Sequence, residues 1–398
     1  MDAQLTIGQR VAQFRQASGM SREELADAIG HSAEWIKSIE IGRRGLDRYT
    51  VIQAIADTLG VDITDLTGRP RTIGDPQTQP AHQMIPALRR ILLRAQLPSA
   101  VAGAPLALSD LRSRVTESNR MRRHARYNDL SRVLPELLTD ITATAQASAG
   151  ADRDAAHHLL AEARHNTSMM TKKLGYVDLA ALAAAQALQA AQASGDPLLV
   201  TAMEWTQAEV CMSAGASAEA RALTAAGLDR VDDLLTDDDD GAWSLWGTLH
   251  LVSAMLDAQS GRQAEAALHL AEAAAAADRV GSRAGYQTEF SSGNQAVHVV
   301  HVALELGEGR NALDRVAHVD MSRLPKERRA RHMIDRARAH VRDGDDAGAM
   351  AEILAADRIA PEGVRSHVLV QEMVTTSARR ARLLGPIADV ARRLQIQI

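Results

Sequence analysis

The side chains with the clearest chemical potential lie in the stretch from Ser21 to Gly45, on one face of a short predicted helix. Within residues 32–40, the apolar side chains Ile36 and Ile39 fall on one side of that helix. The opposite side carries small and polar residues, namely Ser32, Ala33, Glu34, Lys37 and Ser38. Hydroxyl, carboxylate and ammonium groups can form hydrogen bonds with the edges of base pairs. We therefore expect this face to enter the major groove of double-stranded DNA and to read its bases.

A second group of side chains has the chemistry to hold the DNA backbone. The segment from Gly42 to Gly45 places two guanidinium groups on a flexible loop, which suits contacts to phosphate oxygens. The arginines predicted to contact phosphates are Arg10, Arg22, Arg43, Arg44 and Arg48. Bulk charge offers no support, because residues 1–69 contain 8 basic and 10 acidic side chains and the chain has a net charge of −5. DNA binding is thus predicted from the local placement of these side chains.

Two predicted helices joined by a tight turn position the candidate DNA-contacting side chains. Ser21 and Glu24 form a capping box that can start the first helix. Gly30 ends that helix, and the second helix follows from Ser32. Further helices are predicted at residues 50–59, with a capping box of Thr50 and Gln53, and at residues 62–66.

Residues 6–66 resemble the phage-repressor type of helix-turn-helix, the Cro/XRE family. The resemblance is carried by Glu23 to Ala26, by the spacing to Ile36, and by the motif from Ile39 to Arg44. It implies a five-helix DNA-binding domain whose second motif helix is inserted in the groove. The family often has glutamine where Arg22 stands here, and arginine can still contact phosphate. The alternative is a five-helix module that serves protein contact instead of DNA binding.

The composition indicates an all-helical protein. Of the 398 residues, 46% are hydrophobic but only 3% are aromatic, so alanine and leucine supply most of the apolar surface. The single cysteine, Cys211, excludes an intrachain disulfide and fits a reducing compartment. There is no signal peptide and no apolar stretch long enough to cross a membrane. We expect a soluble, cytoplasmic protein.

After the five helices, the chain divides into a linker and a repetitive region. Residues 67–86 contain four of the eleven prolines, which favours an extended linker, and a short basic helix is predicted at residues 84–96. From residue 106 onward, regularly spaced glycines mark candidate hinges between helices: Gly175, Gly215, Gly261, Gly307, Gly344 and Gly385. Alanine stands five residues after each of the first five. The predicted domains are residues 1–66, a linker with a short helix at 67–105, and residues 106–398.

Periods near 40 residues with two helices in each period predict an α-solenoid. We expect about seven helix pairs between Leu106 and Ile398. The fold class is therefore all-α, with a five-helix helix-turn-helix domain followed by the solenoid. The units resemble tetratricopeptide repeats, although their period is longer and the full aromatic pattern is absent.

Polar residues on the first helix of a pair are candidates for ligand contact, because these helices line the concave side of a solenoid. In residues 289–306, Asn294, His298 and His301 share one face at helical spacing. Asn166 occupies a comparable first helix. Amide and imidazole groups can form hydrogen bonds with a ligand backbone. The alternative is that these side chains make polar contacts between neighbouring repeats.

A helix-turn-helix head on a tetratricopeptide-like body resembles the RRNPP group of bacterial quorum-sensing regulators. That resemblance implies a homodimer whose repeat domain binds a short signalling peptide, commonly through asparagines, and here Asn166 and Asn294 are the matching positions. Our first hypothesis is a transcriptional regulator whose solenoid senses a short peptide or small molecule and alters operator binding. The second is a scaffold whose solenoid binds a protein partner while the head tethers it to DNA.

Enzyme and metal chemistry have little support in the sequence. The nucleophile elbow, the phosphate-binding loop and the glycine-rich dinucleotide motif are absent. The histidine pairs, at 157–158 and at 298 and 301, lack a third ligand at a recognisable spacing. We expect neither catalytic activity nor a cofactor.

Overall fold

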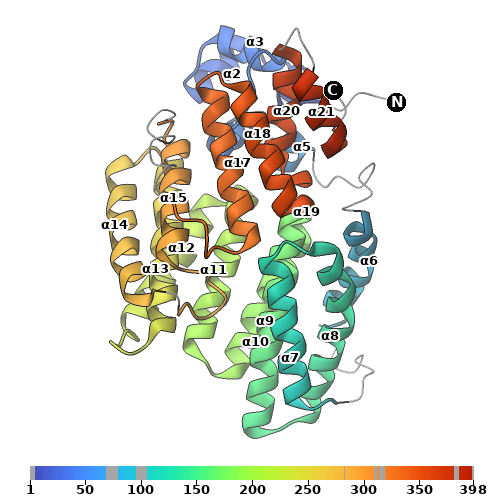
Figure 1. Cartoon of the computed structure of the whole chain (residues 1–398), viewed down its shortest axis with the longest axis vertical. Helices are drawn as coiled ribbons and strands as arrows, with labels where there is room; N and C mark the ends of the chain where they lie inside the picture. The colour runs from blue at the N-terminus through green and yellow to red at the C-terminus, as the bar shows by residue number, and fades with distance from the viewer. Residues whose placement is uncertain are drawn as a thin grey trace.

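The computed structural model describes residues 5–68, 79–95, 105–281, 283–308, 312, 319–380 and 385–396. Every regular element in these ranges is helical, and they contain no strand (Figure 1). The predicted all-α fold, a helix-turn-helix domain followed by packed helical repeats, is confirmed.

Five short helices form the N-terminal domain, called the head below. They are α1 (Ile7–Ala17), α2 (Arg22–Ile29), α3 (Ala33–Glu40), α4 (Tyr49–Leu59) and α5 (Ile63–Thr67). The predicted capping box of Ser21 and Glu24 starts α2, and Gly30 ends it in the left-handed conformation with φ of 69°. Ser32 caps α3, since its hydroxyl accepts a hydrogen bond from the amide of Trp35. The local start and stop signals therefore set the helix-turn-helix geometry.

The predicted capping box of Thr50 and Gln53 is wrong. Helix α4 begins at Tyr49, and its N-cap residue, Arg48, makes no side-chain cap bond. The Thr50 hydroxyl instead donates a 3.0 Å hydrogen bond to the carboxylate of Glu305, which lies in the repeat region. An ionised acceptor forms a stronger hydrogen bond than a neutral one, so this long-range contact takes the hydroxyl from the helix end.

The repeat region consists of helices that pack in succession. Its consecutive helices are α7 (Leu108–Arg123), α8 (Tyr127–Ala147), α9 (Gly150–Lys173), α10 (Val177–Ser194), α11 (Pro197–Ser213), α12 (Ser217–Asp232), α13 (Asp240–Gln259), α14 (Gln263–Val280), α15 (Ser292–Glu305), α17 (Lys326–Arg342), α18 (Asp346–Ile359), α19 (Pro361–Arg365), α20 (Val368–Arg380) and α21 (Gly385–Leu394). The tightest neighbours are the antiparallel pairs α9 with α10, α13 with α14 and α17 with α18. This succession of paired helices matches the predicted solenoid architecture.

Five of the predicted hinge glycines lie directly after the first helix of a pair. Their φ angles run from 71° to 91°, a region that favours glycine because it has no Cβ. The alanines that follow five residues later are fully buried: Ala180, Ala220, Ala266, Ala312 and Ala349. Burial of these small side chains fits the predicted close approach between paired helices.

The repeats curl until the later helices meet the first pair (Figure 1). Helix α7 contacts α17, and α8 contacts α19. The backbone N–H of Asn128 donates a 2.7 Å hydrogen bond to the Glu362 carboxylate, and Lys173 Nζ lies 2.6 Å from the Glu327 carboxylate. These partners are 234 and 154 residues apart in the chain. Long-range polar contacts thus hold the curled solenoid together.

Helix α6 (Gln79–Arg94) begins five residues before the helix predicted at 84–96, and it includes Pro86. Its buried stripe consists of Ala81, Ile85, Leu88 and Leu92, and it packs against α8. Because tertiary packing supplies most of the stability of a protein helix, this stripe offsets the amide that proline lacks. The rest of the predicted linker, residues 69–78 and 96–104, lies outside the described residues.

Candidate DNA-binding surface and ligand cavity

Helix α3 turns its predicted base-reading face away from the core of the head. Of the predicted base readers, Ser32, Glu34 and Lys37 are exposed, while Ala33 and Ser38 are half-buried. On the other side of the helix, Ile36 and Ile39 are fully buried. Lys37 Nζ lies 3.3 Å from the Glu34 carboxylate. An ion pair this exposed is weak, so both groups can exchange their contact for a base edge.

An aromatic stack lies at the start of α3. The rings of His31 and Trp35 are 3.9 Å apart between centroids and 10° from parallel. Burial, followed by the charges of Arg48 and Arg44, lowers the pKa of His31. The imidazole is therefore neutral at neutral pH, and the two stacked rings form an uncharged aromatic surface beside the predicted base-reading face of α3.

Glu40 is a positioning residue that the sequence analysis missed. Its buried carboxylate accepts hydrogen bonds from Arg15 Nε at 2.5 Å and from Arg22 Nε at 2.6 Å. These contacts tie the C-terminal end of α3 to α1 and α2 and thereby fix the orientation of α3 within the head. The arginines precede Glu40 by 25 and 18 residues, so no helical spacing signals the contact.

Three of the predicted phosphate-binding arginines gather beside α3. Arg43 and Arg44 are exposed on the loop that follows the helix, and Arg48 is half-buried next to them. Arg44 and Arg48 also line a cavity of about 380 Å³ between the head and the helices α17 and α20. This surface has the positive charge that a DNA backbone attracts.

The other two predicted phosphate contacts are already engaged within the protein. Arg22 makes its ion pair with Glu40, although 38% of its side chain stays exposed. Arg10 Nη1 lies 3.4 Å from the carbonyl of Leu66, and burial lowers the pKa of Arg10. Arg10 therefore does not belong to the arginine cluster beside α3.

A buried carboxylate joins the head to the C-terminal helices. Glu372 of α20 accepts hydrogen bonds from the amides of Ile7, at 3.0 Å, and Leu46, at 3.4 Å. Burial raises the pKa of Glu372. From the same helix, Val368 and Leu369 complete the hydrophobic core of the head. The head therefore shares its core with the repeat region.

A second contact between head and repeats is centred on Arg338 of α17, which is fully buried. Its guanidinium donates to the backbone carbonyl of Asp47 at 2.7 Å, to Glu305 at 2.6 Å and to Asp335 at 2.8 Å. Glu305 is the same carboxylate that accepts the Thr50 hydroxyl. Although burial alone would lower the pKa of Arg338, the charges of Glu305 and Asp335 raise it. The segment that leads into α4 is thus held by a buried network of charged hydrogen bonds.

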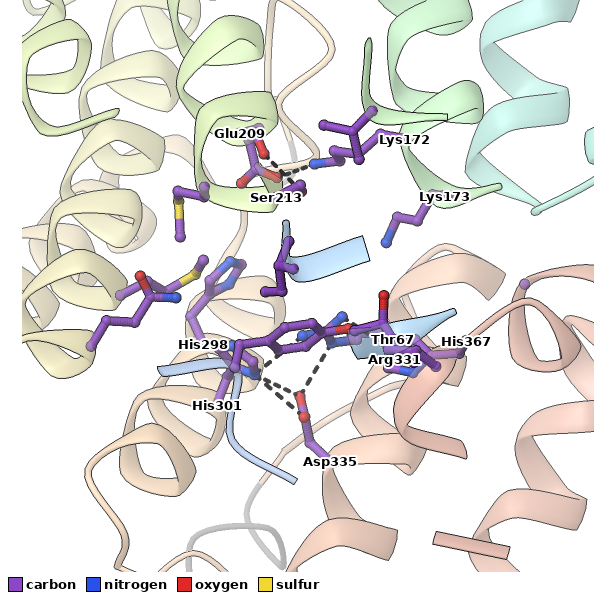
Figure 2. Close-up of a pocket in the computed structure, with 18 of the residues that line it drawn as sticks. Thr67, Lys172, Lys173, Glu209, Ser213, His298, His301, Arg331, Asp335 and His367 are labelled. Atoms are coloured by element: carbon purple, nitrogen blue, oxygen red, sulfur yellow. Dashed lines mark hydrogen bonds and ion pairs between the residues drawn. The ribbon is translucent and has the colours of Figure 1, made fainter. Parts of the chain in front are cut away.

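A cavity of about 190 Å³ lies where the head covers the inner side of the repeats (Figure 2). The head contributes Tyr49 from α4 together with Ile63, Thr64 and Thr67 from α5. The repeats contribute the following residues of α9, α11, α13, α15 and α17: Lys172, Lys173, Glu209, Met212, Ser213, Met255, Gln259, Val297, His298, His301, Arg328, Arg331 and Asp335. These five are first helices of successive pairs, the ones expected to line a concave surface.

Charged groups dominate the polar part of this cavity. Lys172 Nζ donates a 2.5 Å hydrogen bond to Glu209. Burial would raise the pKa of Glu209, but the charge and hydrogen bond of Lys172 lower it to about 2. Burial, with the charge of Arg328, lowers the pKa of His298 to about 4. At neutral pH the wall therefore presents an ionised carboxylate and a neutral imidazole.

The predicted ligand-contacting residues fall into two groups. His298 and His301 line the cavity. Asn294 is buried one turn before His298, and its side-chain oxygen has no hydrogen-bond partner among the described residues. Asn166 is buried away from the cavity in α9, where it bonds to Arg122, Ser118 and Asn119. The structure brings the two histidines together and places Asn166 between α7 and α9.

Lysine, arginine and acidic residues of the cavity escaped the sequence analysis, because they belong to helices far apart in the chain. Within the described ranges, no cluster of three or more histidine, cysteine or acidic side chains has a geometry that could hold a metal ion. Over the same ranges, none of the helices combines the length and the apolar character needed to span a bilayer.

Comparison with known families finds that residues 6–67 match a helix-turn-helix domain. The match covers all five helices of the head, which identifies the head as a helix-turn-helix DNA-binding domain. Neither the curated proteins nor the solved structures contain a match to the chain.

Proposed function

We propose that the protein is a sequence-specific transcriptional regulator whose repeat domain binds a signalling ligand and thereby alters operator binding. The observation that carries this proposal is the cavity walled by both the head and the repeats. A ligand there touches α4 and α5 of the DNA-binding domain directly. Because a ligand shifts an equilibrium only through different affinities for two states, a site shared by two domains is well suited to this role.

The DNA contacts in this proposal come from two surfaces. Ser32, Glu34 and Lys37 read base edges from α3, with Ala33 and Ser38 at its flanks. Arg43, Arg44 and Arg48 contact phosphates, and Arg22 adds a contact when its exposed part reaches the backbone. One helix-turn-helix covers only one half-site, so we propose a homodimer on two half-sites about 34 Å apart.

The ligand in this proposal is a short peptide or a small molecule. His298 and His301 are its proposed contacts, and the side-chain oxygen of Asn294, which lacks a hydrogen-bond partner within the described ranges, lies one turn before His298. A buried polar atom without a partner is costly, which favours a polar ligand or a water near it.

The test begins with selection of binding sites for the purified full-length protein from a pool of random DNA duplexes. A common sequence in the selected pool supports the proposal, and selection without any sequence preference contradicts it. The operator affinity is then titrated with and without a dialysable fraction of culture extract. A change in affinity supports ligand sensing. A change caused only by a large protein partner favours the scaffold alternative.

A further inference from the structure

The lining of the cavity between head and repeats contains more cations than carboxylates. Its cations are Lys172, Lys173, Arg328 and Arg331, and its carboxylates are Glu209 and Asp335. Each carboxylate is already engaged by a cation of the wall. The charge left over is positive, so a ligand that adds a negative group would be favoured.

Of the four cations, Arg328 has the weakest partner within the described part of the chain. There, the nearest carboxylate is that of Glu327, 3.7 Å from Arg328 Nε. Glu327 is more closely bound to Lys173, at 2.6 Å. The charge of Arg328 also reaches the cavity wall, where it helps to lower the pKa of both His298 and Glu209. Arg328 and Lys173 thus share the Glu327 carboxylate, and a second carboxylate would give each cation its own ion-pair partner.

The carboxylate of Asp335 is shared by three partners. It lies 2.8 Å from Arg338, 3.3 Å from His301 and 3.6 Å from Arg331. Three partners hold the pKa of Asp335 well below its usual range, against the opposing effect of burial. Cations therefore outnumber carboxylates at two places in the wall, beside Arg328 and Lys173 and around Asp335.

Part of the remaining wall is apolar, and the space is small. Met212, Met255, Val297, Val177 and Ile63 face the cavity. A volume of about 190 Å³ is slightly larger than the cavities of about 150 Å³ that hold a benzene-sized molecule. One acid group and a short hydrocarbon part fill this space, whereas several residues of a peptide exceed it.

We propose that the cavity binds a small amphipathic carboxylate, with its acid group between Arg328 and Lys173 and its hydrocarbon part against Met212, Met255 and Val297. The inference deepens the proposed ligand-sensing function and rests on it. The acid is either a free small molecule or the C-terminal residue of a peptide.

The same site is linked to the head by the charge network. Arg331 and His301 face the cavity and contact Asp335 (Figure 2). Asp335 also forms an ion pair with Arg338. Arg338 in turn donates to the Asp47 carbonyl of the head. Arg331 lies one helical turn after Arg328 on α17, so an acid held by Arg328 competes with Asp335 for the Arg331 guanidinium and changes how the head is anchored.

The experiment measures binding to the full-length protein in the absence of DNA, by isothermal titration calorimetry. The probes are hexanoate and N-acetylleucine, and their neutral counterparts are hexanamide and N-acetylleucinamide. Saturable binding of an acid without binding of its amide supports the proposal. A preference for hexanoate assigns a free small acid, and a preference for N-acetylleucine assigns a peptide C-terminus. Binding of neither acid, or equal binding of acid and amide, overturns the proposal.

Two variants locate the site. Arg328→Gln should weaken binding of the preferred acid by about tenfold or more, because a charged hydrogen-bond partner is lost. The matched control is Arg323→Gln, which removes an exposed arginine outside the cavity and should leave affinity unchanged. Ser213→Phe fills the cavity without removing charge and should also weaken binding (Figure 2).

Thermal unfolding of each variant without ligand confirms that it is folded. Unchanged affinity in both folded Arg328→Gln and folded Ser213→Phe overturns the location. Since no DNA is present, these outcomes are separate from the failure of the regulator proposal, which is measured by operator affinity alone.

Discussion

At the scale of single residues, Lys37 is the best test of the base-reading face, because its ammonium is exposed and its partner Glu34 binds it weakly. We expect Lys37→Ala to relax the sequence preference at one operator position by about 1–3 kcal/mol, the value of one specific base contact. The measurement is a titration of the selected operator and of its single-base variants, with Arg112→Ala, an exposed site on α7, as control. Equal loss on every sequence would assign Lys37 to the backbone instead.

Arg43 should behave in the opposite way, because it is exposed on the loop beside α3 and reaches phosphates that all sequences share. Arg43→Ala should weaken binding to every duplex alike and lower the slope of log affinity against log salt by about 0.9, the value for one phosphate contact. Titrations at several salt concentrations measure this slope. A slope equal to that of the wild type would remove Arg43 from the interface.

Glu372 gives a residue-scale prediction about pH. Its pKa is raised by burial, so the folded state disfavours the ionised form, and the wild type loses stability as pH rises through that pKa. Glu372→Gln cannot ionise, and we expect its stability relative to wild type to increase as pH rises above the ordinary glutamate pKa of about 4.5 toward neutrality. Melting temperatures of both proteins across this range provide the measurement. A constant difference between them would mean that the carboxyl does not titrate at the interface.

At the scale of helices and turns, the sequence predicted what local chemistry decides. The Ser21 box, the Gly30 stop and the five hinge glycines from Gly175 to Gly344 all act within a few residues, and each lies where it was expected. Thr50 failed as a cap because its hydroxyl bonds to Glu305, 255 residues away. The charged lining of the cavity could not be predicted for the same reason, since Lys173 and its partner Glu327 meet only after the solenoid has curled. Contacts of this kind have no periodicity in the sequence.

Gly261 tests the hinge argument directly. Its φ is 71°, and a Cβ added there would meet nothing within 4 Å. The only cost of substitution is therefore the strain of a residue with a Cβ in this backbone conformation. We expect Gly261→Ala to lower the free energy of unfolding by about 1–2 kcal/mol, the cost of a left-handed alanine. Gly261→Asn should cost less, because asparagine tolerates this conformation. Urea denaturation compares the two, and equal losses would contradict a purely conformational cost.

At the scale of the whole molecule, the head is docked with its reading face outward. The exposed side chains of α3 remain accessible while Glu372 and Arg338 hold Ile7, Leu46 and Asp47 of the head against the repeats. DNA binding and docking are thus compatible, and in the proposed mechanism a ligand in the shared cavity acts on a head that can already meet DNA. Control by the ligand must then come from movement of the docked head, such as a change in the spacing of two heads in a dimer.

A disulfide lock tests this mechanism. A Cβ on Gly45 would lie 3.5 Å from the Cβ of Thr376, within the range of about 3.5–4.5 Å that a disulfide needs. We expect Gly45→Cys with Thr376→Cys, in a chain with Cys211→Ser, to bind the operator normally when oxidised. It should lose the change in affinity that the active extract fraction produces in the reduced form, because the head can no longer move on α20.

Operator titrations of the oxidised and reduced protein, with each single-cysteine variant as control, measure both properties. Loss of operator binding on oxidation would instead show that DNA requires an undocked head. A full ligand response in the oxidised protein would exclude movement between the loop at Gly45 and α20, and would place the switch within the repeats.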